Sequence, residues 1–313
     1  MKRSPIASYI FALLESALYL FLVSALFPLL ALAQDGKILS RAEIPSGSQA
    51  FHAEEFTYSS DGLRIVGYLL MPSQAGKYPC IIYNHGGNPK FNSLNRETAV
   101  RGRNALLASS GYVVIASQYR ESGGSEGHDE FGGRDVNDVL NLLPMLEHEP
   151  SCDVSRIGIL GVSRGGMMTY RTLTKTNRIR AAVVLSGMSN LPLNLKSRAD
   201  MLEVYQTYIP DFATRKDQAL AERSAVQWAD KINADTPIFI LQGTADWRVL
   251  PAEALEMSEA LLCNKHPFRL ALFEGGSHGL PEYKEEVDRV VINWFNDYLR
   301  DGKKWPSLEP HGK

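Results

Sequence analysis

The chain has 313 residues, of which 44% are hydrophobic and 22% are charged, and its formal net charge is −2. These proportions are ordinary for a globular protein, so a collagen-like chain and a chain disordered throughout are excluded. The 33 basic residues are balanced by 35 acidic ones. Because no cationic excess is available to neutralise a phosphate backbone, nucleic acid is not an expected partner.

The first 33 residues have the pattern of an export signal. Lys2 and Arg3 provide a positive start, and residues 16–33 carry no charge and are mostly apolar. This stretch ends in an Ala-Leu-Ala sequence before the polar Gln34, as at signal-peptidase sites. We therefore expect a signal peptide at 1–33 and a periplasmic or extracellular mature protein. An uncleaved membrane anchor is the alternative, since 18 apolar residues approach the length of a spanning helix.

Segments typical of strands alternate with segments typical of helices along the rest of the chain. In chain order, we predict strands at 63–71 and 78–84, a helix at 95–109, a strand at 112–119, a helix at 131–148, a strand at 156–160, a helix from 164, strands at 181–187 and 237–243, a helix at 251–263, a strand at 269–275 and a helix at 282–300. Alternation of this kind predicts an α/β fold, with a mostly parallel sheet between helices. The early strands within 56–84 have no helix between them and are expected to pair antiparallel.

One catalytic domain is expected at 56–300, preceded by an N-terminal extension at 34–55 and followed by a frayed tail at 301–313. Within the domain, residues 188–235 interrupt the alternation because the stretch is long, polar and largely helical in pattern. Insertions after a strand overhang the carboxyl end of the sheet. We therefore interpret 188–235 as a lid-like insertion. Its apolar side chains are expected to divide between the sheet edge and a substrate pocket: Leu191, Leu193, Leu195, Met201, Leu202, Tyr205, Tyr208 and Phe212.

The chain has three cysteines, at positions 80, 152 and 263. Export would permit a disulfide, although an odd count leaves at least one thiol free. Cys80 lies in an apolar strand pattern and is interpreted as a buried small hydrophobic residue. A bridge between Cys152 and Cys263 is compatible with the sequence. No cysteine stands beside a histidine at ligand spacing, so a structural zinc site is not supported. No metal or cofactor is expected.

The strongest catalytic signal is the sequence GVSRGG at 161–166, which follows a predicted strand and opens a predicted helix. Glycines on both sides of Ser163 permit the tight strand-to-helix turn that exposes a nucleophile. The N-terminus of the helix favours negative charge that develops at the hydroxyl. The alternative is a glycine-rich turn whose serine only caps the helix.

Asp246 and His278 each follow a predicted strand, where the active sites of open α/β sheets lie. Imidazole is a natural proton shuttle near neutral pH, and an aspartate can orient it. Asp246 on its own would be interpreted as a turn or helix cap. The chain order Ser163, Asp246, His278 is that of the α/β-hydrolase triad, so we predict these as nucleophile, orienting carboxylate and base. Asp211 and Asp235 are the next candidates for the carboxylate.

A second glycine-rich sequence, HGGN at 85–88, follows the predicted strand 78–84. Acyl transfer requires N–H donors aimed at the tetrahedral oxyanion. We predict that one donor is the backbone N–H of Arg164, directly after the nucleophile. The other is expected from Gly86 or Gly87, because glycine allows the backbone to approach the substrate closely. The ring of His85 is interpreted as a structural hydrogen bonder.

Over about residues 55–300, the chain resembles the catalytic domain of the prolyl oligopeptidase family of serine peptidases, within the α/β-hydrolase superfamily. The motifs that carry the resemblance are HGG at 85–87, YRESGGSEGHDEFGGRDV at 119–136, GVSRGG at 161–166, RSAVQWADKI at 223–232, GTADWRV at 243–249 and GGSHG at 275–279. The resemblance implies the α/β-hydrolase fold and the triad named above. It also implies that 119–136 is a connecting loop. Residues 34–55 are too few for the β-propeller of the large family members, so neither a propeller nor its amine-binding acidic residues are expected.

The predicted function is that of an exported serine hydrolase, which cleaves a small ester or a short peptide through an acyl-enzyme. Arg164 stands where the peptidase members often have an aromatic residue or histidine. One alternative is therefore a small-ester carboxylesterase or dienelactone-hydrolase-like enzyme with the same core. A catalytically dead binding protein on the same fold is the second. A membrane is an expected partner only if the N-terminal segment is retained, and no oligomeric state is indicated.

Overall fold

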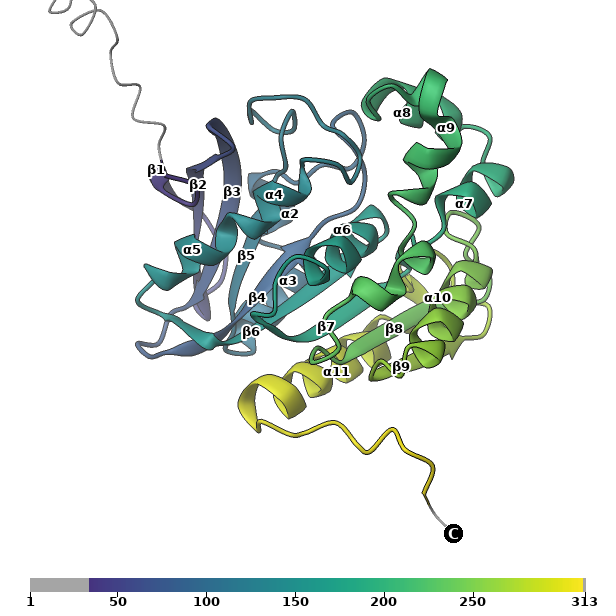
Figure 1. Cartoon of the computed structure of the whole chain (residues 1–313). Coiled ribbons are helices and arrows are strands. Elements are labelled where there is room, and N and C mark those ends of the chain that lie inside the picture. Colours follow the sequence, from purple (N-terminus) through teal and green to yellow (C-terminus); the bar gives the residue numbers. More distant parts are fainter. Residues whose placement is uncertain (1–33, 312–313) are drawn as a thin grey trace, which may run out of the picture. The chain divides into compact units, whose positions relative to one another are not determined.

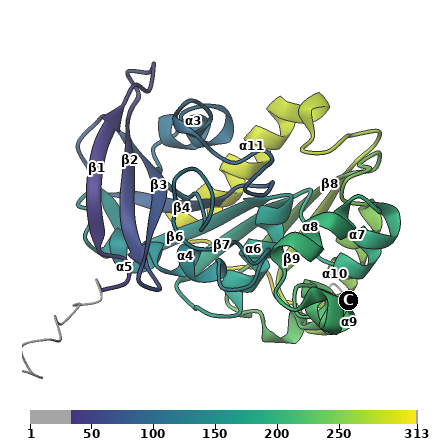
Figure 2. The same ribbon diagram turned by 90° about the horizontal axis from the view of Figure 1, so that it is seen from above.

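A computed structural model of the chain describes residues 34–311. The predicted signal segment lies outside the described residues. A nine-stranded sheet runs through the described part, in the order β1-β2-β3-β5-β4-β6-β7-β8-β9 (Figures 1 and 2). Its strands are β1 (Ile38–Ile44), β2 (Phe51–Ser60), β3 (Leu63–Pro72), β4 (Tyr78–Asn84), β5 (Val113–Ser117), β6 (Cys152–Val162), β7 (Ile179–Leu185), β8 (Ile238–Gly243) and β9 (Phe268–Phe273).

The sheet is parallel over β5, β4, β6, β7, β8 and β9, as the alternation of strands and helices predicts. Strands β1, β2 and β3 are antiparallel to one another, and β3 is antiparallel to β5. The expected antiparallel pairing of the early strands is therefore confirmed for β2 and β3. It is wrong for β3 and β4, because β5 lies between them.

Helices cover both faces of the sheet (Figure 2). The helices are α2 (Arg96–Ala99), α3 (Gly102–Ser109), α4 (Val136–Leu140), α5 (Leu142–Glu147), α6 (Arg164–Leu173), α7 (Leu191–Ser197), α8 (Met201–Tyr208), α9 (Phe212–Ala221), α10 (Pro251–Cys263) and α11 (Lys284–Phe295). The expected helix at 95–109 is divided into α2 and α3 at Val100 and Arg101, because Arg101 has an extended backbone. The expected helix at 131–148 is shorter because residues 131–135 form a loop.

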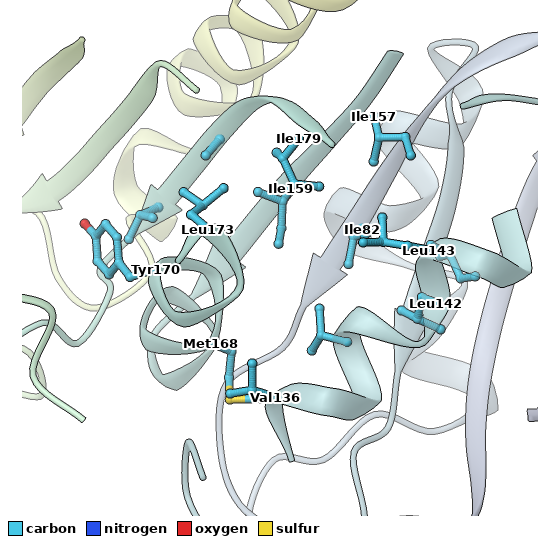
Figure 3. Close-up of a cluster of buried hydrophobic side chains, with 14 of the residues drawn as sticks. Ile82, Val136, Leu142, Leu143, Ile157, Ile159, Met168, Tyr170, Leu173 and Ile179 are labelled. Carbon is cyan, nitrogen blue, oxygen red and sulfur yellow. The ribbon is translucent and has the colours of Figure 1, made fainter. Parts of the chain in front are cut away.

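Two hydrophobic cores lie on opposite faces of the sheet because strand side chains alternate in direction. Ile82 and Ile159 face a core with α4, α5, α6 and α10, whereas Ile81 and Leu160 face a core with α3 and α11. Figure 3 shows the first core, in which Val136, Leu142, Met168 and Leu173 from the helices meet Ile82, Ile157, Ile159 and Ile179 from the strands. These two packed layers hold the central strands, and therefore the loops at their carboxyl ends, in fixed positions.

Two segments depart from the sequence expectations. The predicted extension 34–55 contributes β1 and the start of β2 to the sheet. Strand β1 is mostly exposed along the edge of the sheet, so it lacks the apolar pattern by which a buried strand is recognised. The predicted insertion contains α7, α8 and α9, whose apolar side chains form a third cluster with Phe131 and Met167. Across residues 34–311, every helix is too short or too polar to cross a membrane.

The structure contains a disulfide between Cys80 and Cys152, with the two Cα atoms 5.8 Å apart. The Cys152–Cys263 alternative is therefore wrong, and Cys263 is an exposed free thiol at the end of α10. Cys80 is buried, as expected, but as half of a bridge. The pairing depends on β4 and β6 being neighbours in the sheet. That order cannot be derived from the spacing of the cysteines.

We predict that replacing both Cys80 and Cys152 with alanine lowers the free energy of unfolding by about 4 kcal/mol. The bridged positions are 72 residues apart, and a link across a loop of that length removes considerable entropy from the unfolded chain. Urea unfolding measures the change. Cys263→Ser is the control and should leave the stability of the protein unaltered. Equal losses in both variants would contradict the assignment of the bridge.

Candidate active site

Ser163 occupies the turn between β6 and α6 with a φ of 57° and a ψ of −123°. A non-glycine residue in this region is strained, and such strain is typical of functional turns. The flanking glycines are required because a side chain would clash with the neighbouring backbone. A Cβ on Gly161 would lie 2.1 Å from the carbonyl oxygen of Gly165, and a Cβ on Gly165 would lie 2.0 Å from that of Asn84. The turn therefore holds the Ser163 side chain at the carboxyl edge of the sheet.

His278 and Asp246 meet at the same edge, after β9 and β8 respectively. His278 Nδ1 lies 2.8 Å from Asp246 Oδ2. Asp246 also accepts hydrogen bonds from the backbone N–H groups of Arg248 and Val249, at 2.9 and 3.0 Å. Burial alone would raise the pKa of Asp246, but these bonds and that from His278 outweigh it and hold the pKa below its usual range. Asp246 is therefore ionised, and the proton on His278 lies at Nδ1.

Ser163 and His278 line one cavity of about 390 Å³, together with Gly86, Gly87 and Arg248. The structure thus brings together all three residues of the predicted triad. Neither Asp211 nor Asp235 contacts His278 within residues 34–311, and both are exposed. Gln242, which the sequence did not single out, donates to Asp246 Oδ2 at 3.2 Å. It precedes Asp246 by four residues, but a buried glutamine on a strand belongs to no recognisable motif.

The predicted oxyanion loop lies against the nucleophile. A Cβ on Gly86 would be 3.0 Å from the Ser163 Cβ, so any side chain there would crowd the serine. Gly87 has a φ of 82°, and a Cβ on it would lie 2.1 Å from the carbonyl oxygen of Phe91. Position 87 therefore requires glycine, and a side chain at position 86 would displace the serine. Arg164 begins α6 directly after Ser163, which places all three residues with predicted donors beside the serine.

His85 has the contacts of a structural hydrogen bonder. Its ring is buried, stacks on Tyr119 with centroids 4.3 Å apart, and donates from Nδ1 to the carbonyl of Gly86 at 2.7 Å. Burial lowers the pKa of His85 to about 4. The ring is therefore neutral, and its hydrogen bond to Gly86 stabilises the oxyanion loop.

The Arg164 side chain belongs to a buried ionic group that sequence reasoning missed. Its Nη2 lies 2.7 Å from an oxygen of Asp129 and 2.6 Å from one of Asp135. Its Nη1 donates to the carbonyl of Gly87 at 3.3 Å, and Phe131 covers one face of the guanidinium at 4.6 Å. The two carboxylates come from the stretch 119–136, which the family resemblance identified only as a connecting loop. Arg164 therefore ties the nucleophile turn to this loop and to the oxyanion loop.

The charge balance of this group is unequal, since one buried cation faces two buried carboxylates. Burial raises the pKa of Asp129 to about 6, and the neighbouring charge of Asp135 adds to the rise. The charge and the hydrogen bond of Arg164 lower the pKa of the same carboxyl. Among residues 34–311, Arg164 is the cation that pairs with Asp129, and its charge favours the ionised carboxylate.

A second cavity, of about 330 Å³, also borders Ser163. The insertion contributes Met188, Arg198, Asp200, Met201 and Val204 to its walls, and the exposed Trp247 forms another side. The insertion therefore forms one side of a cavity that borders the nucleophile. Of the eight apolar residues singled out in the insertion, Met201 alone lines this cavity, while Leu191, Tyr205, Tyr208 and Phe212 are buried in the third cluster.

No metal site was found among residues 34–311: nowhere do three or more His, Cys, Asp or Glu side chains gather as ligands would. The site described above consists of a strained serine, an ionised aspartate bonded to a histidine, and glycine-rich turns. This constellation at the carboxyl ends of parallel strands defines an α/β-hydrolase.

Comparison with known proteins identifies the family. Residues 98–302 match the prolyl oligopeptidase family, and the chain belongs to it. The chain is therefore a serine hydrolase, and both the predicted fold and the predicted family resemblance are confirmed.

Among curated relatives, the uncharacterized peptidase YtmA of Bacillus subtilis is 27% identical over 262 residues, which cover 83% of this chain and 99% of that protein. Dipeptidyl-peptidase 5 of Porphyromonas gingivalis is 25% identical, over 77% of this chain and 37% of that one. The chain thus spans nearly all of one relative but little more than a third of the other.

Among solved structures, acylaminoacyl peptidase of Pyrococcus horikoshii superposes with a TM-score of 0.69 at 23% identity, over 84% of this chain and 44% of that one. An acetyl xylan esterase from Paenibacillus sp. R4 superposes with a TM-score of 0.66 at 19% identity, over 84% of this chain and 91% of that one. At these identities the structures demonstrate a shared fold.

We predict that Arg164→Met destabilises the protein by about 3–5 kcal/mol at pH 8, because two buried carboxylates lose their cation. The pKa of Asp129 is already above its unfolded value and would rise further. The folded variant would then bind a proton that the unfolded chain does not, so the loss should shrink as the pH falls to 5. Urea unfolding at both pH values measures this.

The control for this experiment is Arg156→Met. Arg156 pairs with Asp153 on the surface, with a third of its side chain exposed, and such pairs contribute about 0–1 kcal/mol. A loss for Arg164→Met that is the same at pH 5 and pH 8 would show that Asp129 and Asp135 do not depend on Arg164.

Proposed function

We propose that this chain is an exported serine hydrolase in which Ser163, His278 and Asp246 form the catalytic triad. The observation that carries the proposal is the 2.8 Å contact between His278 and the ionised Asp246, with His278 lining the same cavity as the strained Ser163. Export rests on the sequence of residues 1–33. An intact and charged triad gives no support to a catalytically dead protein on this fold.

The protonation states suggest how the reaction proceeds. With its proton on Nδ1 held by Asp246, His278 presents an unprotonated Nε2 that can accept the proton of Ser163 Oγ. The serine oxygen attacks the acyl carbon, and the N–H groups of Arg164 and of Gly86 or Gly87 stabilise the oxyanion. His278 then protonates the leaving group, and the acyl-enzyme is hydrolysed by water.

The second cavity is proposed as the pocket for the acyl group. Its walls include Phe131, Met188, Met201, Val204 and Trp247. Each methylene that a substrate buries there is worth about 0.8 kcal/mol, or roughly a fourfold gain in kcat/KM. The pocket therefore favours substrates with an extended apolar acyl group.

The charges that line the two cavities favour a substrate without a free amine near the scissile bond. Of the residues that line them, only Asp200 is a carboxylate, and Arg198 pairs with it. Arg101, Arg103 and Arg248 line the first cavity, and Arg101 and Arg103 pair with Glu97 and Asp288. An ammonium group bound here would meet the charge of Arg248 and no unpaired carboxylate. Relatives named as peptidases support peptide cleavage, and the charge pattern restricts it to peptides with a blocked N-terminus. The same pattern favours the second candidate, a carboxylesterase.

Active-site labelling tests the triad. A fluorophosphonate probe should label the purified protein, and Ser163→Ala should abolish labelling because the activated hydroxyl is lost. Asp246→Asn should retain the fold and lower kcat by about 10⁴, the penalty for a histidine held in the wrong tautomer. Ser93→Ala is the matched control, since Ser93 lines the same cavity, and its labelling should equal that of the unmodified protein.

Labelling that persists in Ser163→Ala would overturn the assignment of the nucleophile. A loss in kcat below tenfold for Asp246→Asn would mean that another carboxylate orients His278.

The substrate class is tested with p-nitrophenyl esters of increasing acyl length, beside anilides of apolar amino acids with blocked and free amines. We expect kcat/KM to rise with acyl length, esters to be cleaved faster than matched anilides, and blocked anilides faster than free ones. Val204→Trp should fill the acyl pocket and remove the gain with chain length, while acetyl-ester hydrolysis is retained. Steady-state kinetics on one preparation measures all of these.

Faster turnover of free-amine peptides than of matched esters would support an aminopeptidase and contradict the substrate class proposed here. An unchanged chain-length series in Val204→Trp would show that the acyl group binds elsewhere.

A further inference from the structure

A cavity of about 380 Å³ lies apart from the active site, between the insertion and the body of the domain. Its walls come from the loop and first turn of α4, the C-terminal end of α6, and α9 with the residues that follow it. None of its lining residues lines either cavity beside Ser163. The proposed function assigns it no role.

The lining of this cavity is strongly cationic. Five basic side chains contribute to it: Arg134, Arg171, Lys175, Arg215 and Arg223. Only two carboxylates, Glu130 and Glu222, lie among them. Glu222 pairs with Arg215 at 2.8 Å and approaches Arg223 at 3.9 Å. Within the described part of the chain, Arg171 and Lys175 have no ion pair.

Arg171 and Arg223 are held by neutral groups. Arg223, only 5% exposed, donates to the backbone carbonyls of Glu130, Phe131 and Ala219 at 2.9–3.2 Å. Arg171 donates from Nη1 to the carbonyl of Glu222 at 2.6 Å. The Nε of Arg171 is buried and has no acceptor in residues 34–311. Burial lowers the pKa of both arginines more than the nearby carboxylates, Asp135 and Glu222 among them, raise it.

Uncompensated buried charge is costly, and two guanidinium groups in one cavity add mutual repulsion. An anion in the cavity would neutralise them and supply the missing acceptor. Guanidinium forks match the oxygens of phosphate and sulfate, and the volume is sufficient for such a group. We propose that this cavity is a binding site for a tetrahedral oxyanion, phosphate or sulfate, either as the free ion or as a monoester.

Binding there would connect the insertion to the catalytic machinery. Arg215 and Arg223 belong to α9 and the residues after it, whereas Arg171 lies on α6, the helix that begins beside Ser163. Arg223 donates to the carbonyls of Glu130 and Phe131. These residues directly follow Asp129, which pairs with Arg164. A bound anion would therefore fix α9 against α6 and steady the loop beneath the nucleophile.

Titration calorimetry of the full chain with sodium phosphate, against sodium chloride of equal ionic strength, tests the site. We expect saturable binding to the unmodified protein. Loss of the charged hydrogen bonds of one arginine should weaken it about tenfold in Arg171→Gln, and loss of the exposed charge should weaken it about threefold in Lys175→Gln. Arg289→Gln is the matched control, because Arg289 is exposed on α11 and lines none of these cavities, and it should bind as the unmodified protein does.

A sugar phosphate distinguishes the two sources of the ligand. If glucose 6-phosphate binds as phosphate does, the cavity accepts monoesters; if only phosphate binds, it holds the free ion. Absence of saturable phosphate binding would overturn the proposal. So would equal weakening in Arg289→Gln, which indicates general screening, or weakening in Arg248→Gln instead of Arg171→Gln, which would place the anion beside Ser163.

Hydrogen exchange gives a second readout that does not depend on activity. Phosphate should slow exchange of the backbone amides of α9 in the unmodified protein and in Arg289→Gln, because the helix is then fixed to α6. In Arg171→Gln the same protection should need about tenfold more phosphate, in line with the weaker binding. Protection of α9 at the same phosphate concentration in Arg171→Gln as in the unmodified protein would also overturn the proposal.

Discussion

The site depends on how closely three backbone segments approach one another beneath Ser163. The ends of β4 and β6 meet the first turn of α6 at a separation that leaves no space for a Cβ on Gly161 or Gly165. Because these atoms are in contact, the serine turn cannot shift without moving a strand that is packed on both faces. The strain at Ser163 is therefore maintained by the two cores of the domain, not by the loop itself.

Around this contact, hydrogen bonds, burial and ion pairs with neighbouring groups determine the protonation states and positions of the polar side chains of the site. Asp246 keeps its charge because His278 and two backbone N–H groups hold it. His85 stays neutral because it is buried. The ionic group of Arg164 connects both glycine-rich loops to the stretch 119–136. The groups nearest the substrate thus obtain their protonation states and positions from hydrogen bonds and ion pairs with the groups behind them.

Much of the candidate site could be predicted from the sequence, because its motifs each occupy a few consecutive residues. The serine turn, the glycines at 86 and 87, and the polar residues after β8 and β9 are each recognisable within a few residues of a strand pattern. Features that depend on sheet order could not be predicted: β5 lies between β3 and β4, and Cys80 is bonded to Cys152. The partners of Arg164 were missed for the same reason, since they are 35 and 29 residues away along the chain. Strand β1 was missed because an exposed edge strand needs no apolar pattern.

The bridge between Cys80 and Cys152 joins β4 and β6 near the ends opposite the active site. These are the strands that carry the oxyanion loop and the nucleophile at their other ends. Their separation is thus set covalently at one end and by glycine contacts at the other. A cell compartment that keeps thiols reduced would remove the covalent restraint and leave the pairing of the two strands, the cores and the glycine contacts. The same fold would then open more readily inside such a compartment than wherever oxidation is possible, because the unfolded chain would regain the freedom that the bridge removes.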